Sequence, residues 1–367
     1  MKWSLRIARI SGIDVYLHWT FILLLAWMGI SLFNAGKEGW NYFGLVLLLF
    51  VFVLLHEFGH ALVGQRFGVK TDRITLLPIG GVASMERMPE KPWQEFWIAI
   101  AGPLVNLFLA ACIGIYFVAS GQEVEGLNAV SSLSGNFASD LLAVNLTLFA
   151  FNLIPAFPMD GGRILRALLS LKYDRLKATN IAARIGQVLA IGFVFASFYL
   201  NIWLMFIGIF IYLGAGAEAS YESTHSALSR FKVRDALMRQ HTVLDKHCTI
   251  AEAVSRLLDG QEKEFLVSDN GEVIGSVTRD ELISGIEKIG KEGSMGQIAN
   301  PNLVILHPET ALEDVFLMMN QKKVEICPVF EEDQLIGVVN RENIIELLMV
   351  NNALRQNVAL TKTISKA

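Results

Sequence analysis

Cysteine is scarce in this sequence: only Cys112, Cys248 and Cys327 occur among 367 residues. Their wide spacing argues against a disulfide framework and against a thiolate metal site, so we expect small buried residues. Excess charge is also absent, because 31 basic and 35 acidic residues leave a net charge of −4. This balance gives no support for a nucleic-acid partner. No cleavable signal peptide is expected either, since the first apolar run is too long and lacks a small-residue cleavage site.

Apolar residues, by contrast, are abundant and unevenly distributed. They make up 53% of the chain, and the mean hydropathy of +0.45 is high for a soluble protein. Long apolar runs dominate up to about Gly216, whereas the composition from Glu218 onward is that of an ordinary globular domain. The shift predicts a membrane domain over residues 1–217, a linker over 218–232, a soluble part over 233–350 and a tail over 351–367.

Six apolar runs in the first part of the chain predict about six transmembrane helices. They cover residues 15–33, 42–67, 97–118, 141–154, 185–199 and 202–216. Several are shorter than the twenty or so residues of a full span, so we expect tilted or broken helices. Lysine and arginine gather before the first run and after the second and fourth runs. By the positive-inside rule, this is a multi-pass protein of the cell membrane with both termini in the cytoplasm.

The segment over residues 69–85 is too broken for a span. Two short β-prone runs around Pro78 and the pair Gly80 and Gly81 predict a β-hairpin there. An exposed strand of this hairpin could pair with the backbone of an extended peptide. A simple connecting hairpin explains the pattern equally well.

An HExxH motif lies in the second apolar run, at His56-Glu57-Phe58-Gly59-His60. Histidines four residues apart share one face of a helix and can hold one metal ion. Glu57 is then placed to act as a base on water at that metal. Ionisable side chains are costly inside a membrane and usually mark function, which disfavours a chance match. Catalytic zinc takes three protein ligands, so one ligand is still missing.

The best candidate for the missing ligand is Asp160. It lies in the stretch over residues 152–163, where two prolines and two glycines should break a helix. Irregular backbone at membrane depth is tolerated only where it is buried in protein or lines a polar cavity. A carboxylate also suits Zn2+ beside two neutral imidazoles. Asn152 could hydrogen-bond substrate or a developing oxyanion, and a helix-capping role for it is equally plausible.

Asn106 is a further polar residue at membrane depth. It follows Gly102 and Pro103 by about one helical turn in the third apolar run. Such a residue either caps a kink or lines a cavity.

The soluble part contains an internal repeat. Residues 233–286 and 296–349 share an order of strand, amphipathic helix, two strands joined by a turn, and closing helix. Two such units would pack as a pseudo-symmetric α/β pair. The predicted fold is therefore a polytopic α-helical membrane domain with a short β-hairpin insertion, followed by a soluble α/β pair.

Two motifs together carry a resemblance to a known family. HEFGH at residues 56–60 and NLIPAFPMDGG at residues 152–162 resemble the site-2 protease family of intramembrane metalloproteases. The resemblance implies that His56, His60 and Asp160 bind one zinc ion and that Glu57 is the catalytic acid and base. It further implies that the substrates are membrane-embedded proteins.

Other residues take their roles from the same resemblance. The region of Gly80 and Gly81 is similar to the family's substrate-pairing strand, and Asn106 matches its GPxxN element. Asn152 matches the asparagine of the family's second motif.

The internal repeat resembles a pair of CBS domains, which often bind adenine nucleotides. Thr278 and Glu281 stand where the usual pattern has threonine and aspartate, and the second repeat has Asn340 and Asn343 instead. An adenine nucleotide in the first repeat and a structural or homodimerising role for the pair both remain open.

These observations predict an intramembrane zinc endopeptidase that is modulated by its CBS pair. The alternative is a membrane transporter or channel with regulatory CBS domains. The combination of HExxH with Asp160 separates the two, because hydrolysis needs it and transport does not. An inactive sensor of the same fold is disfavoured because His56, Glu57, His60 and Asp160 are all present.

Overall fold

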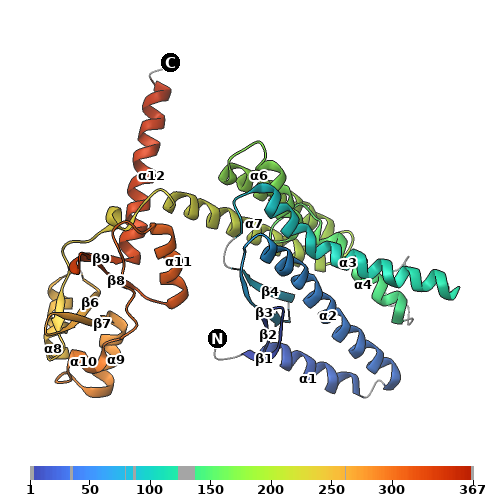
Figure 1. Ribbon diagram of the computed structural model, residues 1–367. Helices are drawn as coiled ribbons and strands as arrows, with labels where there is room; N and C mark the ends of the chain where they lie inside the picture. Colours follow the sequence, from blue (N-terminus) through green and yellow to red (C-terminus); the bar gives the residue numbers. More distant parts are fainter. Residues whose placement is uncertain are drawn as a thin grey trace. The chain divides into compact units, whose positions relative to one another are not determined.

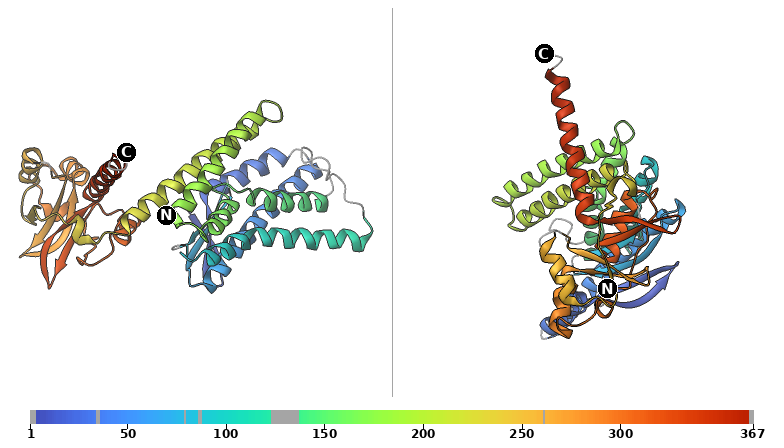
Figure 2. Two further views of the ribbon diagram at one scale, coloured as in Figure 1. Left: turned by 90° about the horizontal axis from the view of Figure 1, so that it is seen from above. Right: turned by 90° about the vertical axis from the view of Figure 1, so that its left-hand side faces the viewer.

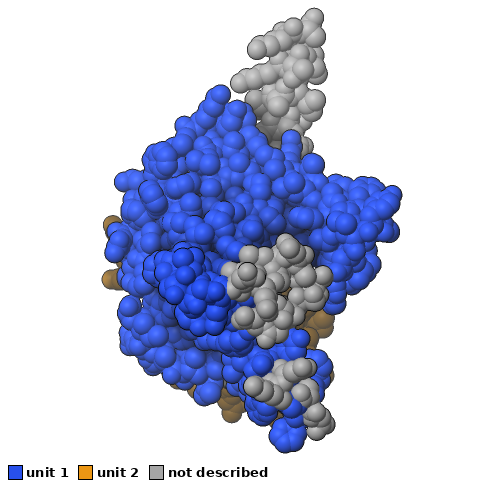
Figure 3. All heavy atoms as spheres, turned by 90° about the vertical axis from the view of Figure 1, so that its right-hand side faces the viewer, with its two compact units in different colours: residues 1–222 blue, residues 223–367 orange. Residues whose placement is uncertain are grey.

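The computed structural model describes residues 4–33, 36–78, 80–85, 88–122, 137–260 and 262–364. The chain divides into two units, residues 1–222 and residues 223–367, which Figure 3 colours separately. Each unit has its own hydrophobic clusters.

A four-stranded sheet opens the first unit (Figure 1), in the order β1 (Ser4–Ile10), β2 (Ile13–His18), β3 (Thr71–Leu77) and β4 (Gly80–Met85). The two outer pairs are antiparallel and the central pair is parallel. Ser11 and Gly12 both have positive φ, as a two-residue hairpin turn requires. The first apolar run therefore begins as a strand, and its helix starts only at Trp19.

In the described part of this unit, seven helices follow the strands or alternate with them. They are α1 (Trp19–Phe33), α2 (Gly36–Arg66), α3 (Pro92–Ser120), α4 (Phe137–Asn152), α5 (Asp160–Leu169), α6 (Arg175–Ser197) and α7 (Trp203–Leu228). Within the described residues, α2, α3, α6 and α7 are the four helices long and apolar enough to cross a membrane. The helices α1 and α4 are apolar but have only 15 and 16 residues.

The packing of α2 positions the HExxH motif. This helix lies beside the sheet and beside α3, as Figures 1 and 2 show. Ile13, Val15 and Ile74 of the sheet pack on Phe58 and Ala61 of α2. The motif is thus enclosed between a sheet and a second helix.

The second unit has two small sheets, β5-β6-β7 and β8-β9. Its strands are β5 (Val243–Asp245), β6 (Glu264–Asp269), β7 (Glu272–Thr278), β8 (Ile326–Glu331) and β9 (Gln334–Asn340). Its helices are the 3-10 helix η1 (Val233–Ala236), α8 (Ile250–Asp259), α9 (Arg279–Ile289), α10 (Met295–Ile298), α11 (Leu312–Lys322) and α12 (Arg341–Ile364).

The two sheets repeat one design. The turn between β6 and β7 has positive φ at Asn270 and Gly271, and the turn between β8 and β9 has it at Glu332 and Asp333. The parallel pairing of β5 with β6 has a counterpart in the second repeat, a single parallel bridge between Leu306 and Val329. The second repeat therefore retains the layout, although its first strand is reduced to one bridge.

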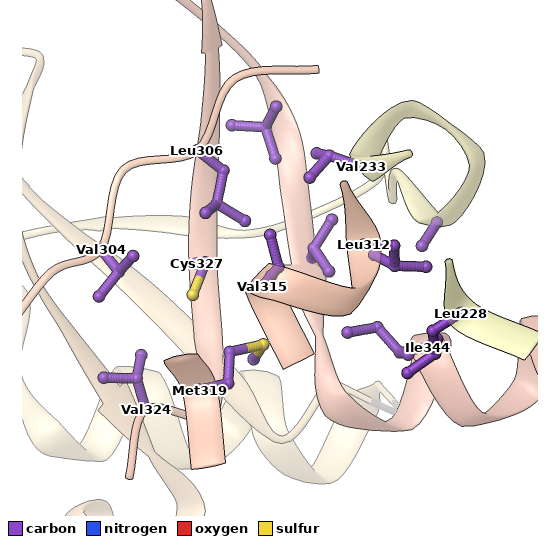
Figure 4. Close-up of a cluster of buried hydrophobic side chains, with 13 residues drawn as sticks. Leu228, Val233, Val304, Leu306, Leu312, Val315, Met319, Val324, Cys327 and Ile344 are labelled. Carbon is purple, nitrogen blue, oxygen red and sulfur yellow. The ribbon is translucent and has the colours of Figure 1, made fainter. Parts of the chain in front are cut away.

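The predicted linker over residues 218–232 is helical in its first part. Helix α7 continues to Leu228, so residues 218–228 are helical. The Leu228 side chain is fully buried in the core of the second unit, together with Val233 and Leu312 (Figure 4).

The three cysteines are unpaired. Cys327 is buried in the core of Figure 4, and burial raises its thiol pKa to about 12. Burial and a neighbouring Glu252 carboxylate raise the pKa of Cys248 to about 11. Neither thiol is poised to ionise near neutral pH.

Candidate metal centre

The two motif histidines meet as the helical spacing predicts. Their rings lie one turn apart on α2, with the two Nε2 atoms 3.0 Å apart and both side chains buried. Burying two imidazoles together without a partner would be costly, so their ring nitrogens should be satisfied.

Each histidine has its Nδ1 atom engaged outside the pair. His56 Nδ1 donates to Asn106 Oδ1 at 2.6 Å, and His60 Nδ1 donates to the carbonyl oxygen of Ile98 at 2.7 Å. Both acceptors belong to α3. Because these oxygens can only accept, the proton of each neutral ring is held on Nδ1. The Nε2 lone pairs are left facing each other.

Asp160 reaches the same point from a distant part of the chain. It begins α5, directly after the irregular segment over residues 153–159. Its Oδ2 atom lies 3.1 Å from His56 Nε2 and 3.1 Å from His60 Nε2. Its side chain is buried with those of the histidines.

Small residues allow the irregular segment to lie this deep. A Cβ atom at Gly161 would overlap the carbonyl oxygens of Leu153 and Ile154, so the start of α5 packs directly on that backbone. On the other side, a Cβ atom at Gly214 of α7 would come 2.6 Å from Pro158. The position of Asp160 is therefore fixed by backbone contacts as well as by side chains.

The three ligand atoms fit a zinc ion. Zinc bonds of about 2.0–2.2 Å at tetrahedral angles place ligand atoms roughly 3.3 Å apart. The separations among His56 Nε2, His60 Nε2 and Asp160 Oδ2 are 3.0, 3.1 and 3.1 Å. Among the described residues, these form the single group of three or more such side chains placed to share an ion. Two imidazoles and a carboxylate are also a donor set that catalytic zinc sites use.

Glu57 and two glycines complete the surroundings. A Cβ atom at Gly81 of β4 would lie 2.7 Å from Glu57 Cγ, so the edge strand passes directly beside this carboxylate. A Cβ atom at Gly102 of α3 would overlap His60 Nε2 and lie 2.7 Å from His56 Nε2. Gly102 therefore keeps the space above the two imidazoles open. Gly80 begins β4, and nothing lies within 4 Å of its Cβ position.

Two asparagines, Asn106 and Asn145, orient the motif histidine His56. The sequence pointed to Asn106 but not to Asn145. Asn106 and Asn145 are both fully buried, and Asn106 Nδ2 donates to Asn145 Oδ1 at 3.3 Å. Asn145 in turn donates to the carbonyl oxygen of Leu141 at 2.9 Å. This chain fixes the orientation of the Asn106 amide, which fixes His56. The signal for Asn145 was its polarity within an apolar run.

Asn106→Ala is expected to weaken zinc binding by about 10–100-fold, since removing an outer hydrogen-bond partner of a ligand has that effect. Competition with a chromophoric chelator would measure the zinc dissociation constant. The matched control is Asn180→Ala, at an exposed position of α6. Equal zinc affinities of the Asn106 variant and the control would contradict this role.

The side chain of Asn152 makes a local contact. Its Nδ2 atom donates to the carbonyl oxygen of Leu148 at 3.0 Å, at the end of α4. This bond lies within the last turn of α4. Asn152 is the last residue of that helix, and the irregular segment that leads to Asp160 follows it.

A separate cavity of about 250 Å³ lies within the second unit. Its lining is rich in acidic side chains and consists of Met238, Gln240, His241, Glu262, Lys263, Glu264, Ile326, Val338, Asn340, Glu342, Asn343 and Glu346. Burial raises the pKa of Glu264, opposed by a hydrogen bond from Asn340. The negative charge of this lining would repel a polyphosphate.

The two residues predicted for a nucleotide have local roles. Thr278 caps α9: its Oγ1 accepts from Glu281 N, and Glu281 Oε2 accepts from Thr278 N at 2.8 Å. This is a capping box, which explains the T-x-x-E spacing without a ligand. Neither residue belongs to the described lining of the cavity, whereas Asn340 and Asn343 do.

The fold and this centre define a class. Long apolar helices, a buried His-His-Asp group and a glutamate adjacent to the first histidine are the parts of a membrane-embedded zinc metallohydrolase.

Comparison with known proteins identifies the family. The model for peptidase family M50 matches residues 44–137 and 127–193, and the CBS domain model matches residues 295–350. A zinc metalloprotease of Methanocaldococcus jannaschii is 35% identical over 95% of this chain and 97% of its own length. Stage IV sporulation protein FB of Bacillus subtilis is 28% identical over 51% of this chain and 62% of its own.

A solved structure, the site-2 protease from Methanocaldococcus jannaschii, has 43% identity, with a TM-score of 0.43, over 59% of this chain and 95% of its own. The chain belongs to peptidase family M50, the site-2 protease family, and is a metalloprotease with a C-terminal CBS domain.

Proposed function

We propose that this protein hydrolyses peptide bonds of membrane-embedded or membrane-associated proteins, using one zinc ion held by His56, His60 and Asp160. The observation that supports this most directly is the convergence of three buried ligand atoms at mutual distances of 3.0–3.1 Å. Adjacent Glu57 gives the centre a proton acceptor, which hydrolysis needs.

Each residue has a distinct part in the reaction. Zinc bound to the three ligands supplies Lewis-acid chemistry, which polarises a carbonyl and makes water more acidic. Glu57 takes the proton of the attacking water and returns it to the leaving amine. Asn106 and the carbonyl of Ile98 hold the imidazoles in the tautomer that leaves Nε2 free. The buried setting strengthens each of these electrostatic interactions.

Strand β4 is the proposed docking edge for the substrate. In the described sheet it pairs on one side, with β3, and Gly81 brings its backbone against Glu57. A substrate segment unwound into an extended form would add to this edge by main-chain hydrogen bonds. The side chain of Asn152 is the proposed donor to the substrate carbonyl or developing oxyanion.

For the membrane topology we propose six crossings with both termini in the cytoplasm. The four long apolar helices and the short apolar helices α1 and α4 support six, and the lysine and arginine distribution supports the orientation. The metal centre then lies towards the cytoplasmic side.

The CBS pair is the proposed regulatory module, with residues 233–286 and 296–349 as its halves. An adenine nucleotide is the ligand class that CBS domains suggest, and the cavity beside Asn340 and Asn343 is where it would bind. Four glutamates in the lining favour a nucleoside with few phosphates. Homodimerisation through this pair is a further proposal.

Removal of the metal tests the proposed function. Proteoliposomes containing the full chain and a single-span substrate protein should lose cleavage after treatment with a zinc chelator. Added zinc should restore cleavage, because the three ligand side chains remain in the chain and can bind the ion again. Cleavage that persists after the bound zinc falls below one ion per ten chains would overturn the proposal.

A further inference from the structure

A buried ion network lies beside the metal centre and takes no part in the chemistry described above. Its central residue is Arg166 of α5, which is 2% exposed. Arg166 Nε donates to Glu95 Oε1 of α3 at 2.7 Å, and its Nη1 donates to Glu218 Oε1 of α7 at 2.6 Å. Glu95 is itself completely buried.

A second arginine extends the network. Arg175, the first residue of α6, donates from Nη1 to Glu95 Oε2 at 2.9 Å and from Nε to Glu222 Oε2 at 3.1 Å. Four helices, α3, α5, α6 and α7, are therefore joined through two guanidinium groups. Such buried ion pairs often add little stability compared with apolar packing, so their geometry is the more informative feature.

The geometry relates Arg166 to Asp160. Both residues belong to the ten-residue helix α5, which begins at Asp160. The Arg166 guanidinium also lies over the ring of Phe157, 5.2 Å from its centroid. Phe157 belongs to the irregular segment that precedes Asp160, and it is fully buried against Ala182, Ala183 and Ala215. One side chain thus holds both the segment before Asp160 and the helix after it.

The same network also links the helix of Asp160 to the helix that orients the two histidines. Glu95 lies on α3, and so do Asn106 and Ile98, whose oxygens orient His56 and His60. The Arg166–Glu95 pair therefore ties the helix of the third ligand to the helix that orients the first two. A guanidinium fork suits this task better than an ammonium group, because it bonds two carboxylates in a fixed plane.

We propose that Arg166 and Arg175, with Glu95, Glu218 and Glu222, are positioning residues that set the Asp160 carboxylate at bonding distance from the ion held by His56 and His60. This inference rests on the proposed function. The network would fix the position of α5 along α3. That position would in turn set the affinity and the symmetry of the metal site.

The test compares three full-chain variants with the parent protein. Arg166→Lys keeps the charge but loses the fork. Glu218→Gln removes the negative charge from one acceptor of Arg166 and leaves the buried Arg166–Glu95 pair intact. Arg184→Lys, at an exposed position of α6, is the matched control. The measurements are the zinc dissociation constant, the visible absorption spectrum of the Co2+-substituted protein and the thermal unfolding midpoint.

We expect Arg166→Lys to weaken zinc binding by about 10-fold, the lower end of the effect of removing a direct hydrogen-bond partner of a ligand, because Arg166 acts on Asp160 only through α5. Its cobalt spectrum should change in intensity and position, because a displaced carboxylate distorts the tetrahedral site. Glu218→Gln should change both readouts in the same direction, with an unfolding midpoint close to that of the parent. The control should match the parent in all three.

Two failures are distinguishable. A parent protein that binds neither zinc nor cobalt at the His-His-Asp group would refute the proposed function. A parent that binds both, with Glu218→Gln and Arg166→Lys matching Arg184→Lys in affinity and spectrum, would refute the positioning role alone. If Arg166→Lys does not fold, the Glu218→Gln comparison decides the matter by itself.

Discussion

Glu57→Gln should lower the rate of substrate cleavage by about 10²–10⁴-fold, the usual contribution of a general acid and base. Glutamine has the shape of glutamate but cannot accept the proton of water. Zinc binding should be unchanged, because the three converging ligand atoms come from His56, His60 and Asp160. The initial rate of cleavage of a single-span substrate in proteoliposomes and the zinc content per chain would measure both effects.

The control for this variant is Glu287→Gln, at an exposed position of α9 in the second unit. It makes the same chemical change far along the chain and should leave the rate as it is. If Glu57→Gln cleaved as fast as this control, the assignment of Glu57 as the proton carrier would be wrong. A loss of zinc in Glu57→Gln would instead show that the substitution disturbs the metal site.

Gly102→Ala should weaken zinc binding and lower the cleavage rate by about 10²-fold, because misplacing a reacting group by about 1 Å costs a rate factor of that size. The added methyl group would overlap His60 Nε2 and crowd His56 Nε2. The rings cannot swing away freely, since their Nδ1 atoms are bonded to α3 at 2.6 and 2.7 Å. Isothermal titration with zinc, with cleavage measured in parallel, would show the loss.

Gly114→Ala is the matched control, because it lies on the same helix and its Cβ position has nothing within 4 Å. Both substitutions change the intrinsic helix propensity by the same amount, and only Gly102 directly precedes a proline, Pro103. A difference between them therefore reports crowding at position 102, from the imidazoles and from Pro103, and not intrinsic helix propensity. Equal zinc affinities of the two variants would mean that the imidazoles can move aside.

The convergence of the three proposed ligand residues could be predicted from sequence because their chemistry is local or unusual. A spacing of four on a helix brings His56 and His60 together without any knowledge of the fold. Asp160 is an acid in a glycine-rich and proline-rich break within an apolar region, and the structure brings it to the same point. For each of these residues, a polar side chain in an apolar region is costly, so a chance occurrence without a function was disfavoured.

The supporting residues were harder to predict, because they depend on tertiary contacts. The carbonyl of Ile98 has no side-chain signature, and Gly102 matters only because α3 crosses the motif at that residue. Thr278 and Glu281, by contrast, have a clear sequence pattern that has two explanations. Their spacing suits both a ligand and a helix cap, and here it forms a cap.

Strand β2 was missed for a related reason. Its alternating residues Ile13 and Val15 are buried, but the apolar run continues without a break into α1. The period of two is therefore hidden by the apolar helix that follows. The composition also gave no sign that part of the predicted linker is helical, because a helix can continue past the point where its composition changes, as α7 does.

Helix α7 has a consequence for binding equilibria. It carries Glu218 and Glu222 of the ion network at one point and ends at Leu228 in the core of the second unit. A molecule that binds the cavity of that unit and shifts the zinc affinity by some factor must obey thermodynamic linkage. Zinc then shifts the affinity for that molecule by the same factor. Titration of such a molecule, with and without zinc, would therefore measure whether the two sites are coupled and by what factor.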